Sequence, residues 1–149
     1  KSWENDFALV GIRSRGLPLA HRLAQTVQAQ TGFDPPVGAV DVTLYRDDLG
    51  GGAPAPVVKS TELPFDVEGK RIVLVDDVLF TGRTIRSAMS VLLDFGRPAF
   101  IRLAVLVDRG GRELPIEPQY VGFETDVDEN KMVKVYLSEM DDEDKAVIL

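Results

Sequence analysis

Short apolar runs alternate along this chain with longer stretches in which apolar side chains recur every three or four residues. Four runs have the length and composition of strands: Phe7 to Ile12, Val40 to Tyr45, Ile72 to Val75 and Phe100 to Val107. Two stretches, Leu17 to Gln28 and Ile85 to Phe95, have the spacing of amphipathic helices. This alternation predicts an α/β fold with a mostly parallel central sheet flanked by helices.

The third apolar run, Ile72 to Val75, is continuous and β-branched, as expected of a central strand that is covered on both faces. Asp76 and Asp77 follow it, at the carboxyl end of the strand, where ligands bind in open α/β sheets. In Thr81-Gly82-Arg83-Thr84, the glycine lets the backbone come close to a ligand. The helix that follows begins here, and its free N–H groups attract anions. Taken singly, either acid could merely cap the loop. Together they predict a site for a sugar phosphate.

A second candidate anion site lies between the first predicted strand and the first predicted helix. Arg13, Ser14, Arg15 and Gly16 supply two cations, a hydroxyl and a glycine at a helix start. The alternative is that the two arginines are surface charges, and for Arg13 both interpretations stay open. His21, the single histidine, lies inside the first helix and is expected to be a surface or packing residue.

Composition restricts the class of protein. A length of 149 residues with 44% hydrophobic content fits one domain, residues 1–149. The absence of cysteine excludes a disulfide scaffold and a thiolate metal site. No apolar run reaches membrane-spanning length, and the first residues do not resemble a signal peptide, so we expect a cytoplasmic protein that does not bind membranes.

The string RIVLVDDVLFTGRTI at 71–85 resembles the phosphoribosyl pyrophosphate (PRPP) signature of the type I phosphoribosyltransferases. The resemblance implies that Asp76 and Asp77 bind the ribose hydroxyls and are the catalytic acids. It also implies that the 5′-phosphate is held by the loop that follows. The residues of that nucleotide-binding stretch are Val78, Leu79, Phe80, Thr81, Gly82, Arg83 and Thr84.

Three further segments, VGIRSRGLPLAHRLA, DVTLYRDDL and FGRPAFIRLAVLVDRGGRELPIEPQYVG, resemble the bifunctional pyrimidine operon attenuation regulators and uracil phosphoribosyltransferases. The resemblance extends from Leu9 to Met140. It implies a type I phosphoribosyltransferase fold with a small C-terminal hood, a homo-oligomer, and formation of UMP and pyrophosphate from uracil and PRPP. It also implies regulation of pyrimidine genes by attenuation of transcription on a messenger RNA leader. The family's usual N-terminal helix is not represented in this sequence.

The same resemblance assigns the remaining site residues. Ser14, Arg15 and Gly16 would bind pyrophosphate. In this family, the turn that contains them often has a non-proline cis peptide. The Gly- and Pro-rich segment from Arg46 to Lys59 is interpreted as a mobile lid, with Arg46 placed to meet pyrophosphate. Arg109 belongs near pyrophosphate or the base. Mg²⁺ is expected as the cofactor, held mainly through substrate oxygens and water.

The C-terminal part carries the last predicted strand and most of the negative charge. Met132, Val133, Val135 and Leu137 alternate as in a strand. The resemblance places Val133 in the hood over the base, although the residues themselves favour a plain core position for it. The net charge is −7, and residues 124–149 hold nine acids against three lysines. The tail EMDDEDKAVIL is expected to be a solvated acidic edge.

This acidity argues against RNA binding, which favours a basic surface. The segment Gly122 to Asp128 also differs from the Gly-Lys-Asn-Ile-Pro-Thr-Ser that family members typically have, and Gly111 stands where they have histidine. Both changes lie near the expected base site. The alternative function is therefore a regulatory protein that senses PRPP or UMP with weak or no turnover.

Overall fold

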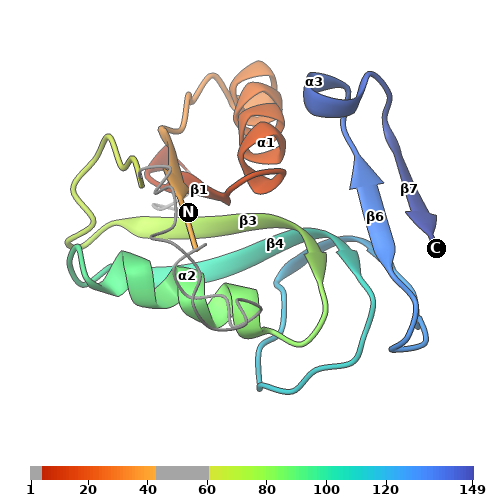
Figure 1. The fold of residues 1–149 in the computed structure, drawn as a ribbon. Helices are drawn as coiled ribbons and strands as arrows, with labels where there is room; N and C mark the ends of the chain where they lie inside the picture. Colours follow the sequence, from red (N-terminus) through yellow and green to blue (C-terminus); the bar gives the residue numbers. More distant parts are fainter. Residues whose placement is uncertain (1–4, 43–60) are drawn as a thin grey trace, which may run out of the picture.

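The computed structural model describes residues 5–42 and 61–149. Within them, a five-stranded sheet has the order β2-β1-β3-β4-β5, with every neighbouring pair parallel (Figure 1). The elements of this part are β1 (Ala8–Ile12), α1 (Gly16–Thr31), β2 (Val37–Val40), β3 (Arg71–Leu79), α2 (Arg83–Leu93), β4 (Phe100–Asp108) and β5 (Tyr120–Glu124). The predicted α/β fold class is confirmed.

The two longer helices cover opposite faces of the sheet, α1 on one side and α2 on the other (Figure 1). The larger core cluster packs Ile85 and Leu92 of α2 against Ile72 and Leu74 of β3. On the other face, small residues of α1 such as Ala20 pack against the opposite side of β1 and β3. Because β3 is covered on both faces, its continuous apolar run matches the expectation for a central parallel strand.

The second strand was placed wrongly by the sequence pattern. The structure has β2 at Val37–Val40, so the predicted strand from Val40 to Tyr45 overlaps it at one residue, and residues 43–45 lie outside the described part. This strand contains Gly38 and Ala39, whose side chains are too small to give the apolar pattern by which a strand is recognised in a sequence. The backbone of Ala39 also pairs with Glu62. The strand therefore has small residues where another segment packs closely against it, and it lacks the alternating pattern.

The third strand is longer than predicted. β3 continues through Asp76 and Asp77 to Leu79, because β4 runs beside it to Asp108 and extends the ladder of hydrogen bonds past the acidic pair. The helix α2 begins at Arg83, two residues before the first predicted apolar position. The turn between β3 and α2, where the phosphate is expected, therefore consists of residues 80–82 alone.

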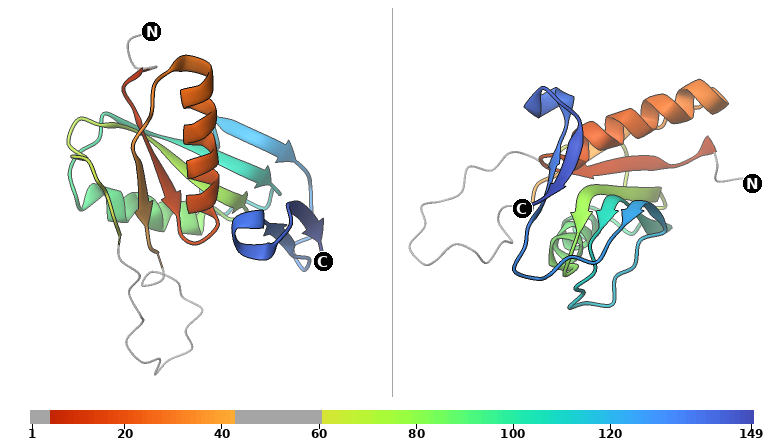
Figure 2. Two further views of the ribbon diagram at one scale, coloured as in Figure 1. Left: turned by 90° about the horizontal axis from the view of Figure 1, so that it is seen from above. Right: turned by 90° about the vertical axis from the view of Figure 1, so that its right-hand side faces the viewer.

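The C-terminal part holds three elements that the sequence did not predict. They are β5, the short helix α3 (Ser138–Asp141) and β7 (Lys145–Ile148). The predicted last strand is present as β6 (Val133–Tyr136), which pairs antiparallel with β7. We call residues 133–148 the hood. It stands beside the carboxyl ends of β3 and β4, with α3 next to α1 (Figures 1 and 2).

No helix in the described ranges is long and apolar enough to span a membrane.

Candidate functional site

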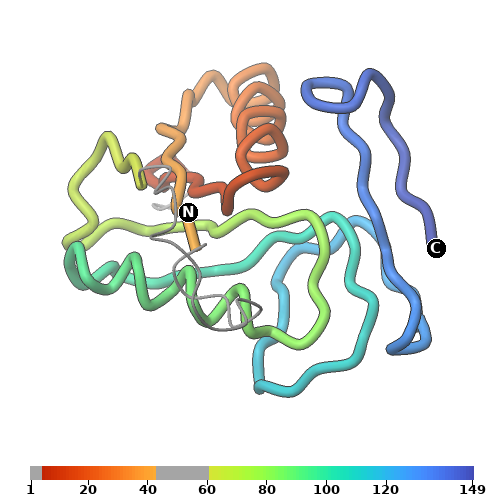
Figure 3. Tube along the Cα trace, viewed as in Figure 1, coloured from red at the N-terminus to blue at the C-terminus, as the bar shows by residue number. Residues whose placement is uncertain are grey.

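The turns that follow β1, β3 and β4 converge at one edge of the sheet. In the chain trace, the turn after β3 and the long loop after β4 run side by side (Figure 3). Backbone hydrogen bonds join them, because the N–H groups of Glu113 and Leu114 donate to the carbonyl oxygen of Thr81 at 2.9 and 3.2 Å. This edge is where open α/β sheets bind ligands, so the sheet brings the predicted site residues together.

Two glycines bring the start of α1 against β3. An added Cβ on Gly16 would lie 2.4 Å from the carbonyl oxygen of Val75 and 3.4 Å from Cα of Asp76. A Cβ on Gly11 would lie 2.6 Å from the carbonyl oxygen of Gly16. Neither position has room for a side chain. The close contact places the turn that contains Ser14 and Arg15 beside the acidic pair of β3.

The turn after β1 has an exposed hydroxyl and a half-buried cation. The peptide bond between Arg13 and Ser14 is cis, and Ser14 is exposed. Arg13 donates to Glu62 at 3.0 Å on the surface. The Arg15 side chain is half-buried and turns toward the hood, where it contacts Asp141. Both arginines therefore contact residues far away in the chain, Arg13 at the surface and Arg15 in the hood.

The acidic pair is partly engaged with its own backbone. The carboxylate of Asp76 accepts from the N–H of Asp77 at 2.9 Å, and that of Asp77 accepts from the N–H of Val78 at 2.7 Å. Asp76 is buried, with 7% of its surface exposed, whereas Asp77 is half-buried. These bonds fix both carboxyl groups at the point where β3 leaves the core, within reach of the turn after β1.

The turn after β3 has the geometry of a helix start. Gly82 adopts the left-handed conformation with φ 94°, which favours glycine, and the N–H of Arg83 donates to the Thr81 hydroxyl at 3.2 Å. The Arg83 guanidinium pairs with Glu113 at 2.6 Å, and 67% of the Arg83 side chain is exposed. Thr84 lies in the first turn of α2. This turn therefore offers backbone N–H groups, two hydroxyls and the Arg83 guanidinium as donors, and their role in binding a phosphate stays a prediction.

The other residues of the predicted nucleotide stretch have structural side chains. Leu79 is buried in the larger core cluster, and Val78 packs in a third cluster beneath the hood. Their backbone atoms alone could contact a ligand. Phe80 is different, because its ring lies against the guanidinium of Arg109, with Cζ 3.8 Å from the ring centre.

Arg109 is a buried cation. Only 4% of its surface is exposed, and one Nη donates to the carbonyl oxygen of Asp128 at 2.9 Å. Its Nε has no hydrogen-bond partner among the described residues, and none of their carboxylates lies within ion-pair distance of it. A buried, unsatisfied donor is costly unless a ligand supplies the acceptor. The unsatisfied Nε is consistent with the expected place of Arg109 near pyrophosphate or the base, and that role stays a prediction.

An ion pair that the sequence analysis missed holds the loop after β4 in place. Arg112 donates to both carboxylate oxygens of Asp108 at 2.8 and 2.7 Å, and also to the backbone carbonyls of Ile116 and Phe80. The hydrogen bonds from Arg112 lower the pKa of the Asp108 carboxyl group below its ordinary value. The four-residue spacing of opposite charges was the available sequence signal.

The segment that differs from the family lies directly on this loop. The N–H of Thr125 donates to the carbonyl oxygen of Asp108 at 2.9 Å, and that of Val127 donates to the carbonyl oxygen of Arg109 at 3.3 Å. An added Cβ on Gly110 would come within 3.0 Å of the Asp126 carboxylate. Residues 125–128 therefore pack against the chain at Arg109, and the expectation that they lie near the base site stays a prediction.

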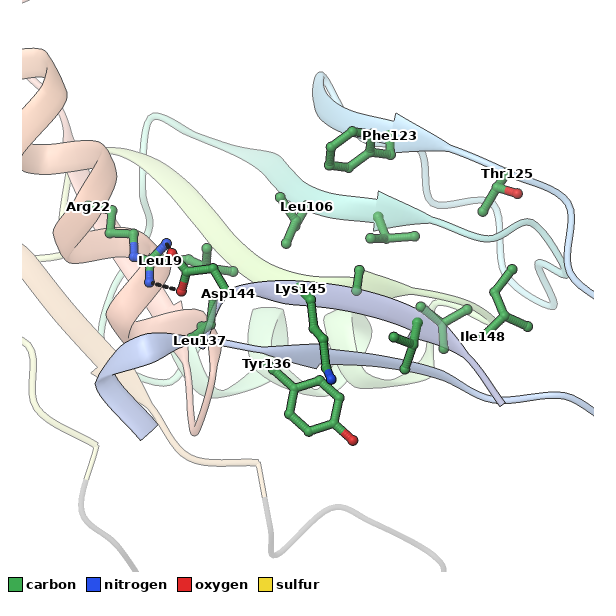
Figure 4. A pocket seen from close by; sticks show the side chains of 14 residues that line it. Leu19, Arg22, Leu106, Phe123, Thr125, Tyr136, Leu137, Asp144, Lys145 and Ile148 are labelled. Atoms are coloured by element: carbon green, nitrogen blue, oxygen red, sulfur yellow. Dashed lines mark hydrogen bonds and ion pairs between the residues drawn. The ribbon is translucent and has the colours of Figure 1, made fainter. Parts of the chain in front are cut away.

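A cavity of about 510 Å³ separates the hood from β4 and β5 (Figure 4). Its walls are mainly apolar and include Leu106, Phe123 and Ile148. Val133 also lines it and packs against the third cluster, with Val107 and Leu137. The role of Val133 in base binding stays a prediction, because its side chain is in contact with core residues.

Glu139 and Asp144 are exposed, as expected of a solvated acidic edge, but three acids of the tail also form ion pairs that the sequence did not indicate. Asp141 pairs with Arg15, and both Glu139 and Asp144 pair with Arg22. Sequence reasoning missed these contacts because the residues lie more than 110 positions apart. Arg46 and the predicted lid lie outside the described residues.

Comparison with known proteins agrees with this geometry. Residues 1–139 match the family model described as the phosphoribosyl transferase domain. The chain is 54% identical to a bifunctional protein PyrR of Pelotomaculum thermopropionicum, over 97% of this chain and 80% of the relative. A bifunctional protein PyrR of Thermus aquaticus is 55% identical, over 93% and 77%.

Solved structures share the fold. A hypoxanthine phosphoribosyltransferase of Trypanosoma cruzi superposes with a TM-score of 0.66 at 20% identity, covering 89% of this chain and 67% of that one. A purine phosphoribosyltransferase of Pyrococcus horikoshii superposes with a TM-score of 0.60 at 26% identity, covering 83% and 73%.

Proposed function

Because the chain belongs to the phosphoribosyl transferase family, and within it to the bifunctional PyrR proteins, we propose that it makes UMP and pyrophosphate from uracil and PRPP. One observation carries the proposal. The contact of Gly16 with Val75 sets the turn after β1 beside Asp76, so that one edge of the sheet offers groups for both ends of PRPP. The second activity implied by the name of its relatives is regulation of pyrimidine genes.

The reaction needs a site that holds two partners in line. Uracil N1 attacks C1′ of PRPP, the N1–C1′ bond forms, the bond from C1′ to pyrophosphate breaks, and the N1 proton is lost. Positive charge develops on the ribose ring, and the carboxylates of Asp76 and Asp77 favour it electrostatically. Most of the rate enhancement would come from positioning, because no described residue stands out as a base.

The groups at the site divide into three sets along the substrate. Ser14, Arg15 and Arg109 would face the pyrophosphate, the last two with buried Nε groups that lack acceptors in the described residues. The acidic pair would hold the ribose hydroxyls. The turn after β3, with Thr81 and Gly82, would bind the 5′-phosphate at the start of α2, where the helix dipole and backbone N–H groups attract an anion.

Mg²⁺ fits the chemistry of these donors. Asp76 and Asp77 offer hard carboxylate oxygens, which magnesium prefers, and no cluster of three or more metal-ligating side chains occurs in the described ranges. A magnesium ion held through few protein ligands and the oxygens of PRPP would neutralise the charge of the departing pyrophosphate. Asp76 and Asp77 are the residues that would contact it or its water.

The charge of the C-terminal part gives less support to the proposed regulatory activity. Binding of a messenger RNA leader favours cations, whereas residues 124–149 are strongly acidic. The structure does not remove this objection, because Arg15 and Arg22 are engaged by three of the nine acids and the net charge is unchanged. We expect any RNA binding to weaken steeply as salt rises, in proportion to the phosphates neutralised.

The enzyme is tested by pyrophosphate release with PRPP, uracil and Mg²⁺. The expected result is turnover by the native chain and its loss in Asp76→Asn/Asp77→Asn, with the fold retained by circular dichroism. Asp94→Asn is the matched control, because Asp94 is an exposed acid at the far end of α2. PRPP binding without turnover in the native chain would support a sensor, and an unaffected double variant would contradict the assigned role of the acidic pair.

A further inference from the structure

Two arginines, Arg15 at the N-cap of α1 and Arg22 within the helix, are held by the acidic turn of the hood, residues 138–144. Arg15 and Arg22 are seven residues apart, about two helical turns. Their partners come from more than 110 residues further along the chain. α1 begins at the proposed pyrophosphate turn, so these contacts connect the hood to the site.

Arg22 anchors the acidic turn away from the site. Its Nε donates to Glu139 at 2.7 Å and one Nη donates to Asp144 at 2.8 Å, a contact visible in Figure 4. The Asp144 carboxylate also accepts from the N–H of Ser138 at 2.7 Å, which closes the turn on itself. Two carboxylates on one guanidinium make this anchor redundant, because loss of either leaves the other in place.

Asp141 is fixed before it meets Arg15. One of its carboxylate oxygens accepts from the N–H of Leu137 at 2.9 Å, and Leu137 is itself buried in the third cluster. Arg15 Nη2 donates to the two oxygens of Asp141 at 2.8 and 3.0 Å. Both side chains are largely shielded, with 25% of Arg15 and 16% of Asp141 exposed. The carboxylate is therefore a rigid attachment point for a long, otherwise flexible side chain.

The contact leaves part of the Arg15 guanidinium available. Its bonds to Asp141 use Nη2 alone, and Nε is buried without a hydrogen-bond partner among the described residues. An arginine offers five N–H donors in a fixed plane, so fixing one corner also sets the direction of the others. An oxygen of a bound anion would satisfy the buried Nε at little entropic cost, because the side chain is already ordered.

We propose that Asp141 is a positioning residue that holds the Arg15 guanidinium in the orientation that binds the pyrophosphate group of PRPP. This inference rests on the proposed function and adds to it a role for the acidic hood. Asp141 acts through Arg15 and does not itself contact the substrate. The Arg22 anchor docks the turn on α1 and so keeps Asp141 next to Arg15.

The test compares Asp141→Asn with Glu139→Gln. Both changes remove one carboxylate from the hood contact with α1, but only Asp141→Asn releases Arg15, because Asp144 still holds Arg22 when Glu139 is replaced. For Asp141→Asn we expect the KM for PRPP and the inhibition constant of pyrophosphate to rise about tenfold, the effect of roughly one charge-assisted hydrogen bond. The kcat and the KM for uracil should change less than about threefold, since ribose and base contacts are kept. Glu139→Gln should leave all four constants nearly unchanged.

A third variant separates positioning from docking. In an Arg15→Met background, replacement of Asp141 by Asn should cause no further rise in the KM for PRPP, because the group that it positions is gone. Equal rises in Asp141→Asn and Glu139→Gln would show that the turn acts only by docking the hood. A lower KM in Asp141→Asn would show that Asp141 competes with pyrophosphate for Arg15. Either result would overturn the proposal.

Direct binding distinguishes this inference from the proposed activity. Calorimetric titration with inorganic pyrophosphate and Mg²⁺ reports the Arg15 site without turnover. Weaker pyrophosphate binding by Asp141→Asn than by the native chain would support the positioning role even if no UMP were formed. Equal affinities would overturn it, whether or not the chain is active. A native chain that binds no pyrophosphate would overturn both proposals.

Discussion

Gly111 lies directly against the ring of Phe80, such that an added Cβ would come within 2.5 Å of Cε1. The same ring stacks on the buried guanidinium of Arg109, at 3.8 Å from its centre. Gly111 also has φ 84°, a conformation that side chains rarely adopt. The histidine that relatives of this family typically have here would not fit while Phe80 keeps its position. The absence of a side chain at Gly111 therefore leaves room for the Phe80 ring to stack on Arg109.

Replacing Gly111 by alanine should displace Phe80 and loosen Arg109. We expect a loss of about 2 kcal/mol in the free energy of unfolding, from the strained φ and the ring contact together, and a KM for PRPP raised severalfold. Urea unfolding and steady-state kinetics measure the two effects. Gly110→Ala is the control, because Gly110 has a similar φ of 74° but meets only the movable end of Asp126. A Gly110 variant with an equal rise in KM would contradict the role assigned to the ring.

The contact of Gly16 with β3 predicts a large effect from a single methyl group. The Cβ of Gly16→Ala would lie 2.4 Å from the carbonyl oxygen of Val75, and neither backbone can move without shifting α1 or the central strand. We expect a loss of about 3 kcal/mol or more in the free energy of unfolding, together with much weaker PRPP binding.

Gly69→Ala provides the comparison for that variant. Gly69 has φ 72° with open space around it, so alanine there should cost only about 1 kcal/mol, from backbone strain, and should leave PRPP affinity unchanged. Chemical unfolding and calorimetric titration of both variants measure the difference. Similar losses in the two variants would mean that α1 can move away from β3 easily.

The ion pair between Asp108 and Arg112 should stabilise the loop after β4. Both side chains are largely buried, at 13% and 17% exposed, and Arg112→Met would leave the Asp108 carboxylate without its main partner. We expect a loss of about 2 kcal/mol in the free energy of unfolding. Asp108→Asn together with Arg112→Met should cost less than the two single losses added, because neither group is then left unpaired.

An exposed ion pair serves as the reference for that loop. Arg71 contacts Asp6 at 3.0 Å with 33% and 63% of the side chains exposed, so Arg71→Met should cost about 0.5 kcal/mol at most. Thermal or urea unfolding measures both. A cost for Arg112→Met as small as that for Arg71→Met would show that the backbone bonds of the loop hold it without the ion pair.

The contact between the hood and α1 should be sensitive to acid. Hydrogen bonds from Arg22 lower the pKa of Glu139 from its ordinary value of 4.5 to about 2, and those from Arg22 and Ser138 lower the pKa of Asp144 as well. Because the folded state holds these protons less tightly than the unfolded state, the contribution is fully present above about pH 4.5. It is lost as the pH falls toward 2.

Hydrogen exchange measures this loss at defined amides. The N–H groups of Leu137 and Ser138 donate to Asp141 and Asp144, so their protection should fall across that pH range before β3 and β4 open. In Glu139→Gln/Asp144→Asn, the protection of Leu137 and Ser138 should already be low at pH 7. Protection in the native chain that stays constant down to pH 3 would contradict an electrostatic origin for the contact.

Local patterns predicted the elements near the middle of the chain well. The run Ile72 to Val75 and the helical spacing after Thr81 lie within β3 and α2, although both elements extend further than predicted. The apolar pattern of β3 ends at Val75, but hydrogen bonds from β4 extend the strand to Leu79. The acidic pair therefore lies inside β3. The family resemblance assigned Arg83 to the phosphate, and only the folded chain shows that its exposed guanidinium also pairs with Glu113.

The sequence by itself determined the α/β class, the acidic pair with its phosphate turn, and the family to which the chain belongs, because these depend on contiguous residues whose types are dictated by local chemistry. The tertiary structure alone decided that Gly16 touches Val75, that Gly111 makes room for Phe80, and that Asp141 holds Arg15. Such contacts join residues that are remote in the chain, and their geometry follows from how the strands and helices pack. No local pattern of charge or hydrophobicity encodes them.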